Sequence, residues 1–254
     1  MMIRRISLGF ALAFALLLPA QANADVTVKK GMLQQGLFHD DGCRPVDAKA
    51  MFDRCSCIAN IEQITITSAD HAAGAEALNK YFAGWSQKHM CPGKQTATTV
   101  DMKKLKKPFP NQQTHLVETK FAAGNVVSLL THDTAWTGGA GDKTSMLGSI
   151  GNVATGKLYE VNDLIDPANF AAVNKYIYEY LYTNYRKDVF AKPKTASYLK
   201  DGKCQNCSLY LAKDGLHMVF NEYAVGPGSS GNLDVPLPPK YIKDKDIISA
   251  LAGK

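Results

Sequence analysis

The 254-residue sequence lacks the short patterns that mark the common catalytic and metal centres. It has a single C-x-x-C segment and no histidines at H-x-x-x-H spacing, so it offers no zinc ligand set. Neither Ser229 nor Ser230 completes a G-x-S-x-G elbow, which argues against a serine nucleophile of that type. Residues 138–141 lack the G-x-G-x-x-G spacing of a nucleotide cradle. We therefore expect no metal, no cofactor and no assignable catalytic residue.

Long apolar runs are absent after the first residues. The run from Leu8 to Leu18 follows two arginines and precedes an A-x-A site at residues 22–24. This pattern is typical of a secretory signal peptide, here residues 1–24, cleaved after Ala24. The apolar run is also shorter than the ~20 residues that a membrane span needs. The sequence therefore predicts a periplasmic or secreted protein with no membrane span in the mature chain.

Positive charge is in modest excess, since the formal net charge is +6. The lysines are scattered apart from the cluster Lys103 to Lys107. This cluster has no interleaved aromatic residues, which together with the export signal argues against a nucleic-acid partner. Two interpretations remain open: contact with anionic wall polymers or an acidic partner, or a solvated loop before Pro108 and Pro110.

The six cysteines are an even number, which favours disulfides in an exported chain. Cys204 and Cys207 are close enough in sequence to close a small loop of their own. The other four would bridge the N-terminal part in a pairing that the sequence does not assign: Cys43, Cys55, Cys57 and Cys91. A redox C-x-x-C is the alternative for Cys204 and Cys207, but such a pair sits between a strand and a helix, unlike this segment.

The apolar pattern predicts an α+β fold, with an antiparallel sheet that has helices packed on one face. Residues 25–110 are expected to form a smaller cystine-stabilised subdomain, with a strand at 58–67 and a helix that ends at 91–93. Residues 111–254 are expected to form the C-terminal domain. Its expected strands are 115–121, 125–132, 145–153, a hairpin in 209–223 and an edge strand at 233–237. Its expected helices begin at Asp166 and at residue 240.

A glycine-rich crossing between two of these strands carries a family resemblance. Four segments, in this order, resemble the RsiV/PdaC-type extracytoplasmic domain: 126–130, 136–140, 152–163 and 214–227. The resemblance covers residues 115–240 and implies an extracytoplasmic α+β module. That module occurs beside cell-wall deacetylase domains and as the lysozyme-binding sensor of an anti-sigma factor. Two residues depart from the family pattern, because Gly141 replaces its histidine and Trp136 its tyrosine.

The resemblance and the export signal together predict a cell-envelope binding module rather than an enzyme. Its expected ligand is a peptidoglycan-related glycan or a wall-degrading enzyme such as lysozyme. The expected binding residues are Trp136, Thr137, Gly138, Gly139, Tyr223, Gly226 and Pro227, since aromatic rings stack on sugars and anchor protein interfaces. A structural role is the alternative for them, with Trp136 in the core and glycines that permit the crossing. Two other functions stay open: an envelope hydrolase that uses His132, Asp133 or other carboxylates, and a structural, disulfide-stabilised periplasmic protein.

Overall fold

The computed structural model describes residues 26–37, 57–88, 112–136, 143–185 and 197–253. The first half contains β1 (Thr27–Leu37), β2 (Cys57–Thr67), α1 (Ala72–Lys88), β3 (Gln112–Ala123), β4 (Val126–Trp136), β5 (Lys143–Asn152) and β6 (Lys157–Leu158). The second half contains α2 (Val161–Leu164), α3 (Phe170–Asn184), β7 (Leu199–Lys200), β8 (Lys203–Cys204), β9 (Cys207–Ala212), β10 (Gly215–Phe220), β11 (Leu233–Leu237) and α4 (Lys245–Ala252). The predicted signal peptide and the Lys103 to Lys107 cluster lie outside the described residues.

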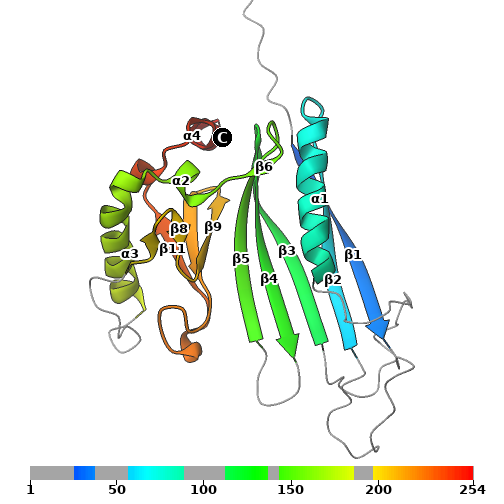
Figure 1. The fold of residues 1–254 in the computed structure, drawn as a ribbon, viewed down its shortest axis with the longest axis horizontal. Helices are drawn as coiled ribbons and strands as arrows, with labels where there is room; N and C mark the ends of the chain where they lie inside the picture. Colours follow the sequence, from blue (N-terminus) through cyan, green and yellow to red (C-terminus); the bar gives the residue numbers. More distant parts are fainter. Residues whose placement is uncertain (1–25, 38–56, 89–111, 137–142, 186–196, 254) are drawn as a thin grey trace, which may run out of the picture.

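The larger sheet has six strands in the order of the sequence, β1 to β6 (Figure 1). Its strand pairs are antiparallel except for β2 and β3, which run parallel from Ile58 to Ile61. Beyond this pairing, side chains bond backbone groups of the two strands: Val117 N of β3 donates to Glu62 of β2 (2.6 Å), and Ile66 N of β2 donates to Asn79 of α1 (2.7 Å). These acceptors satisfy backbone groups that a continued ladder would have paired.

Helix α1 covers one face of this sheet. Its buried residues Ala75, Leu78 and Phe82 recur at helical spacing and pack on a cluster that includes Val127 and Leu129 of β4. The strand predicted at 58–67 and the helix predicted after it are therefore present. The N-terminal part contributes β1, β2 and α1 to a sheet that β3 to β6 complete, so both predicted parts of the chain share one sheet.

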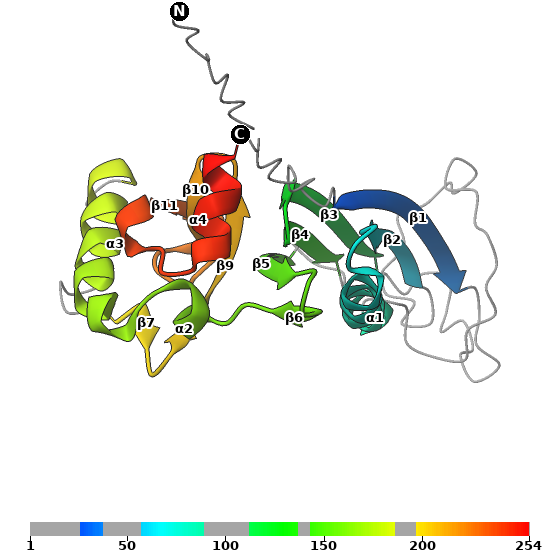
Figure 2. The ribbon, with the colours of Figure 1, turned by 90° about the horizontal axis from the view of Figure 1, so that it is seen from above.

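A second sheet, in the order β11-β10-β9, packs on the opposite face of the larger one near β4 and β5 (Figures 1 and 2). Helix α3 covers its outer side through Val173, Ile177 and Leu181, which are all fully buried. Tyr176 of α3 and Tyr185, the residue that caps its C-terminus, also donate to carbonyls of the edge strand β11: Tyr176 to Pro236 (2.9 Å) and Tyr185 to Asp234 (3.1 Å). The tyrosine-rich helix therefore caps the edge of the sheet that it covers.

The α+β class is confirmed, and the structure refines its arrangement. The expectation was one antiparallel sheet with helices on one face. The structure has two main sheets, one parallel strand pair, and a helix on the outer side of each sheet. Strand β4 lies in the middle and is buried continuously from Val126 to Thr131, because α1 covers one face and the second sheet the other. None of the helices in the described ranges is long and apolar enough to cross a membrane.

Candidate functional site

The predicted binding surface is only partly described. Trp136 is the last residue of β4, and the next strand, β5, begins at Lys143. Thr137, Gly138 and Gly139 lie outside the described residues, as does Gly141, which replaces the family's histidine. The structure therefore places the two ends of the glycine-rich crossing, and the role of its residues stays a prediction.

The other predicted residues lie in the loop between β10 and β11. Tyr223 is the most exposed large side chain among the apolar and aromatic residues described, at 77 %, while Gly226 is half-buried and Pro227 exposed. The loop begins at Asn221, whose Oδ1 accepts from Met146 N of β5 at 2.6 Å. This bond brings the base of the loop to the strand that follows the glycine-rich crossing, so the base of the loop lies beside the first half of β5, at the lower end in Figure 1.

His132 and Asp133, the residues of the hydrolase hypothesis, lie on opposite faces of the sheet. Asp133 is bonded to the buried His115 on the α1 side, where Trp85 packs edge-on against the His115 ring. His132 lies on the other side, with Nε2 3.0 Å from Glu118 Oε1. The alternation of a β-strand explains the separation. The two side chains do not form an acid–base pair.

Among the described residues, three side-chain oxygens accept hydrogen bonds from backbone N–H groups across the junction of the two sheets. Ser128 Oγ accepts from Leu211 N (2.7 Å) and Ser208 Oγ from Gly148 N (2.7 Å), and the third is the Asn221–Met146 bond. Ser128 is fully buried in the apolar middle of β4, so its hydroxyl has no access to water. These bonds satisfy backbone N–H groups where no strand ladder continues, and they fix how the sheets meet.

Ser128→Ala is expected to lower the free energy of unfolding by about 1–3 kcal/mol, because it leaves the buried Leu211 N–H without an acceptor. Urea titration measures the loss. Native-state hydrogen exchange should also show that the Leu211 amide loses protection more than its neighbours in β9. Unchanged protection at Leu211 would show that this bond does not hold the sheets together.

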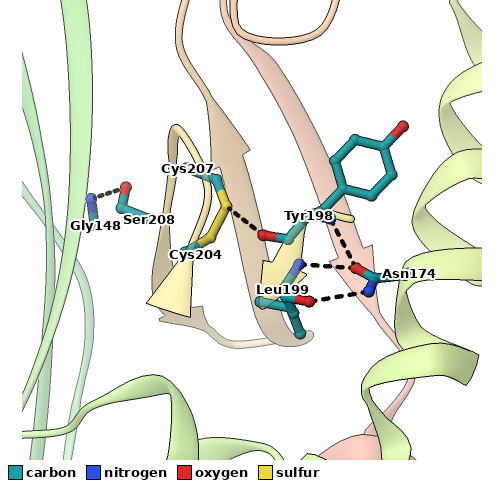
Figure 3. The surroundings of a disulfide bond; sticks show 7 residues. All are labelled: Gly148, Asn174, Tyr198, Leu199, Cys204, Cys207 and Ser208. Carbon is teal, nitrogen blue, oxygen red and sulfur yellow. Dashed lines mark hydrogen bonds between the residues drawn. A yellow bond between two sulfur atoms is a disulfide. The ribbon is translucent and has the colours of Figure 1, made fainter. Parts of the chain in front are cut away.

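The predicted bond between Cys204 and Cys207 is present (Figure 3). It closes the turn between β8 and β9, next to Ser208. Asn174 of α3 holds the neighbouring segment, because its Oδ1 accepts from Tyr198 N (2.9 Å) and Leu199 N (2.8 Å). Of the other cysteines, Cys43, Cys55 and Cys91 lie outside the described residues, and Cys57 begins β2. The disulfide thus fastens the β7–β8 hairpin to the second sheet.

A polar network lies on the second sheet. The His217 ring is mostly buried and lies between two carboxylates, with Nδ1 3.2 Å from Asp234 and Nε2 3.1 Å from Asp214. Burial works to lower the pKa of His217, but the hydrogen bonds and charges of Asp234 and Asp214 outweigh it and raise the pKa above its ordinary value. Tyr210 stacks on the His217 ring and donates to Asp234 at 2.6 Å.

The face of the larger sheet that looks toward this network carries further charged side chains. Lys120 Nζ lies 2.8 Å from Glu118 and 5.6 Å from the centre of the Tyr210 ring. Its hydrogen bond and positive charge lower the pKa of Glu118. Within the described ranges, no group of three histidine, cysteine or carboxylate side chains could hold a metal ion. The bonds of the network connect β9, β10 and β11 through Tyr210, His217 and Asp234.

A cleft of about 540 Å³ lies where the second half of the chain meets β5 and α1. We call it the junction cleft. The aromatic and charged side chains that line it are Tyr81, Tyr159, Glu160, Asp201 and Lys203, together with the middle of β5, Asn162 and the disulfide. Sequence reasoning did not identify this cleft, because its walls come from four separated segments. Only the turn signals near Asp201-Gly202 and the C-x-x-C segment lie in the regions that line it.

Comparison with known proteins identifies a domain and a fold. Residues 162–240 match DUF3298, a family described as a protein of unknown function, so the chain carries a DUF3298 domain. A solved member of the DUF3298 family from Bacteroides fragilis NCTC 9343 is similar over 91 % of this chain and 99 % of its own, with a TM-score of 0.64 and 13 % identity. A DUF3298 family protein from Pseudomonas aeruginosa PAO1 covers 89 % and 97 %, with a TM-score of 0.52 and 10 % identity. At such identities the likeness concerns the fold. No curated protein matches the sequence.

Proposed function

We propose that this chain, which carries a DUF3298 domain, is an exported cell-envelope module that binds a wall-degrading enzyme of the lysozyme type. The resemblance of residues 115–240 to the RsiV/PdaC-type domain and the signal-peptide pattern of residues 1–24 support this proposal. The observation that carries it is the exposed Tyr223 in the loop between β10 and β11.

The Tyr223 backbone adopts an unusual conformation. Its φ is +62°, in the left-handed region that side chains other than glycine, asparagine and aspartate rarely adopt. Such a conformation costs on the order of 1–3 kcal/mol and persists where the surroundings enforce it, often at functional sites. Here the flanking residues are fixed, because Glu222 N donates to Asn232 (3.2 Å) and Ala224 N to Asn221 O (3.0 Å).

The loop therefore holds the Tyr223 backbone in one conformation before binding and exposes the aromatic ring. Ala224 and Val225, directly after Tyr223, are buried in the core of the second sheet and anchor the loop. Tyrosine is enriched among the residues that dominate the binding energy of protein interfaces. A residue whose backbone is already fixed also loses less conformational entropy on binding. Both properties favour a protein partner for this end of the molecule.

Tyr223→Asn tests this proposal, since asparagine tolerates a positive φ and removes only the ring. We expect immobilised lysozyme to retain the wild-type chain, and the substitution to weaken the affinity about tenfold or more, measured by biolayer interferometry. Tyr81→Ala removes another exposed ring, from α1, and should leave this binding unchanged. Failure of the folded chain to bind lysozyme, or retention on purified sacculi alone, would contradict the proposal. The second result would favour a glycan partner instead.

A further inference from the structure

The junction cleft has walls that its own contacts hold in place. On one side Gly148 of β5 lies so close to β9 that an added Cβ would approach Leu209 O to 2.4 Å. On the other side the β7–β8 turn packs on α2, where a Cβ at Gly202 would approach the Asn162 side chain to 2.4 Å. The disulfide between Cys204 and Cys207 closes this wall. The volume of the junction cleft, about 540 Å³, is in the range of small-molecule sites, which are usually preformed.

Two tyrosines supply the aromatic part of the cleft. Tyr81 is 50 % exposed, and its ring is held edge-on against the buried Phe82, with 5.2 Å between ring centroids. Tyr159 is half-buried, and its hydroxyl accepts from Asn152 at 2.9 Å. Burial raises the pKa of Tyr159 to about 12, so the phenol is neutral at physiological pH and adds no charge. These rings offer flat surfaces with polar ends, as sugar-stacking residues do.

Exposed polar groups lie around the rings. Asp201 is exposed at the tip of the β7–β8 turn, where its φ is +51°, and the exposed Glu160 directly precedes α2. Carboxylates accept hydrogen bonds and have no donor of their own, so they suit ligands rich in hydroxyl or amine donors. The lining has two carboxylates and one ammonium, that of Lys203, although the whole sequence has a net charge of +6. This local excess of negative charge disfavours anions.

We propose that the junction cleft binds a short saccharide that carries no anionic groups. One sugar ring stacks on Tyr81, and its hydroxyl or amine groups donate to Asp201 and Glu160. The site is distinct from the Tyr223 loop. In Figure 1 that loop extends from the lower end of the second sheet, whereas α2, which lines the cleft, lies at the upper end. The saccharide site therefore does not depend on the enzyme-binding proposal.

Calorimetric titration of the full chain with three tetrasaccharides tests the ligand class. The tetramers of N-acetylglucosamine and of glucosamine are expected to bind, and the tetramer of galacturonate is not. The affinity for the glucosamine tetramer should fall as salt is added, because it depends on charge. Absence of binding by both of the first two tetramers, or equally tight binding of galacturonate, would overturn the proposal.

Variants then locate the site. Tyr81→Ala should weaken binding of the N-acetylglucosamine tetramer about tenfold. Asp201→Asn, which keeps a residue that tolerates a positive φ, should weaken binding of the glucosamine tetramer several-fold. Tyr223→Asn is the matched control and should leave both affinities unchanged, whatever its effect on lysozyme binding. Circular dichroism confirms that each variant is folded. Wild-type affinities in both Tyr81→Ala and Asp201→Asn would place the saccharide elsewhere and refute the assignment.

Discussion

Gly148→Ala is expected to lower the free energy of unfolding by about 3 kcal/mol. At this point β5 and β9 touch backbone to backbone, and the new Cβ would lie 2.4 Å from Leu209 O and 2.6 Å from Leu209 C. A flexible side chain could move away from such a contact, but a strand backbone cannot move alone. The nearby bonds from Gly148 N to Ser208 and from Leu211 N to Ser128 resist a shift of either strand.

Gly84→Ala is the matched control for this substitution. Gly84 is exposed within α1, and among the described residues no heavy atom would lie within 4 Å of its added Cβ. Alanine has a higher helix propensity than glycine, so this variant should be more stable by about 0.5–1 kcal/mol. Urea titrations of the two variants beside the wild type measure both effects. Equal stability of Gly148→Ala and the wild type would mean that the two sheets do not make this close contact.

The elements that rest on local patterns are the ones that sequence reasoning predicted well. The stripe Val173, Ile177 and Leu181 predicts α3, and the same residues are fully buried against the second sheet. The apolar run from Val126 to Leu130 predicts a buried strand, and the structure buries this part of β4 on both faces. In these segments the side-chain period and the tertiary environment agree, so local information suffices.

The junction between the two sheets depends on contacts that no local pattern indicates. Ser128 bonds to a residue 83 positions away, and Asn221 to one 75 positions away. In the sequence Ser128 reads as a polar interruption of an apolar strand, and its buried acceptor role becomes visible only when β9 lies against β4. The junction cleft escapes prediction for the same reason, since Tyr81 and Asp201 are brought together by the fold alone.

Asp234→Ala is expected to cost about 2–3 kcal/mol of stability, because it removes the acceptor that two side chains of the second sheet share. The Tyr210 hydroxyl, on a residue that is only 4 % exposed, would lose its 2.6 Å bond, and His217 would lose the bond from Nδ1. The Asp234 side chain is 43 % exposed, so solvent screens part of its charge and a larger loss is not expected. Asp246→Ala, an exposed carboxylate in α4, should change stability by less than about 0.5 kcal/mol.

The same network gives stability a pH dependence whose sign follows from His217. The pKa of His217 in the folded state is raised above its ordinary 6.5, so protonated His217 stabilises the fold. This contribution is complete below about pH 6.5, the unfolded-state value, and is lost as the pH rises through the folded-state pKa. The loss has a structural cause: neutral imidazole has one N–H and can donate to Asp214 or to Asp234, but not to both.

Urea titrations at a series of pH values from 5.5 to about 9 therefore separate this network from the other titrating groups. The wild-type free energy of unfolding should decrease as the pH rises above about 6.5. His217→Gln keeps a side chain that can donate a hydrogen bond but cannot be protonated, so its stability should lack this decrease. The slopes of the two pH profiles should therefore differ near neutral pH and become equal only above the folded-state pKa of His217. Parallel profiles across the whole range would show that His217 does not titrate with folding, and that the two carboxylates do not hold it as an imidazolium.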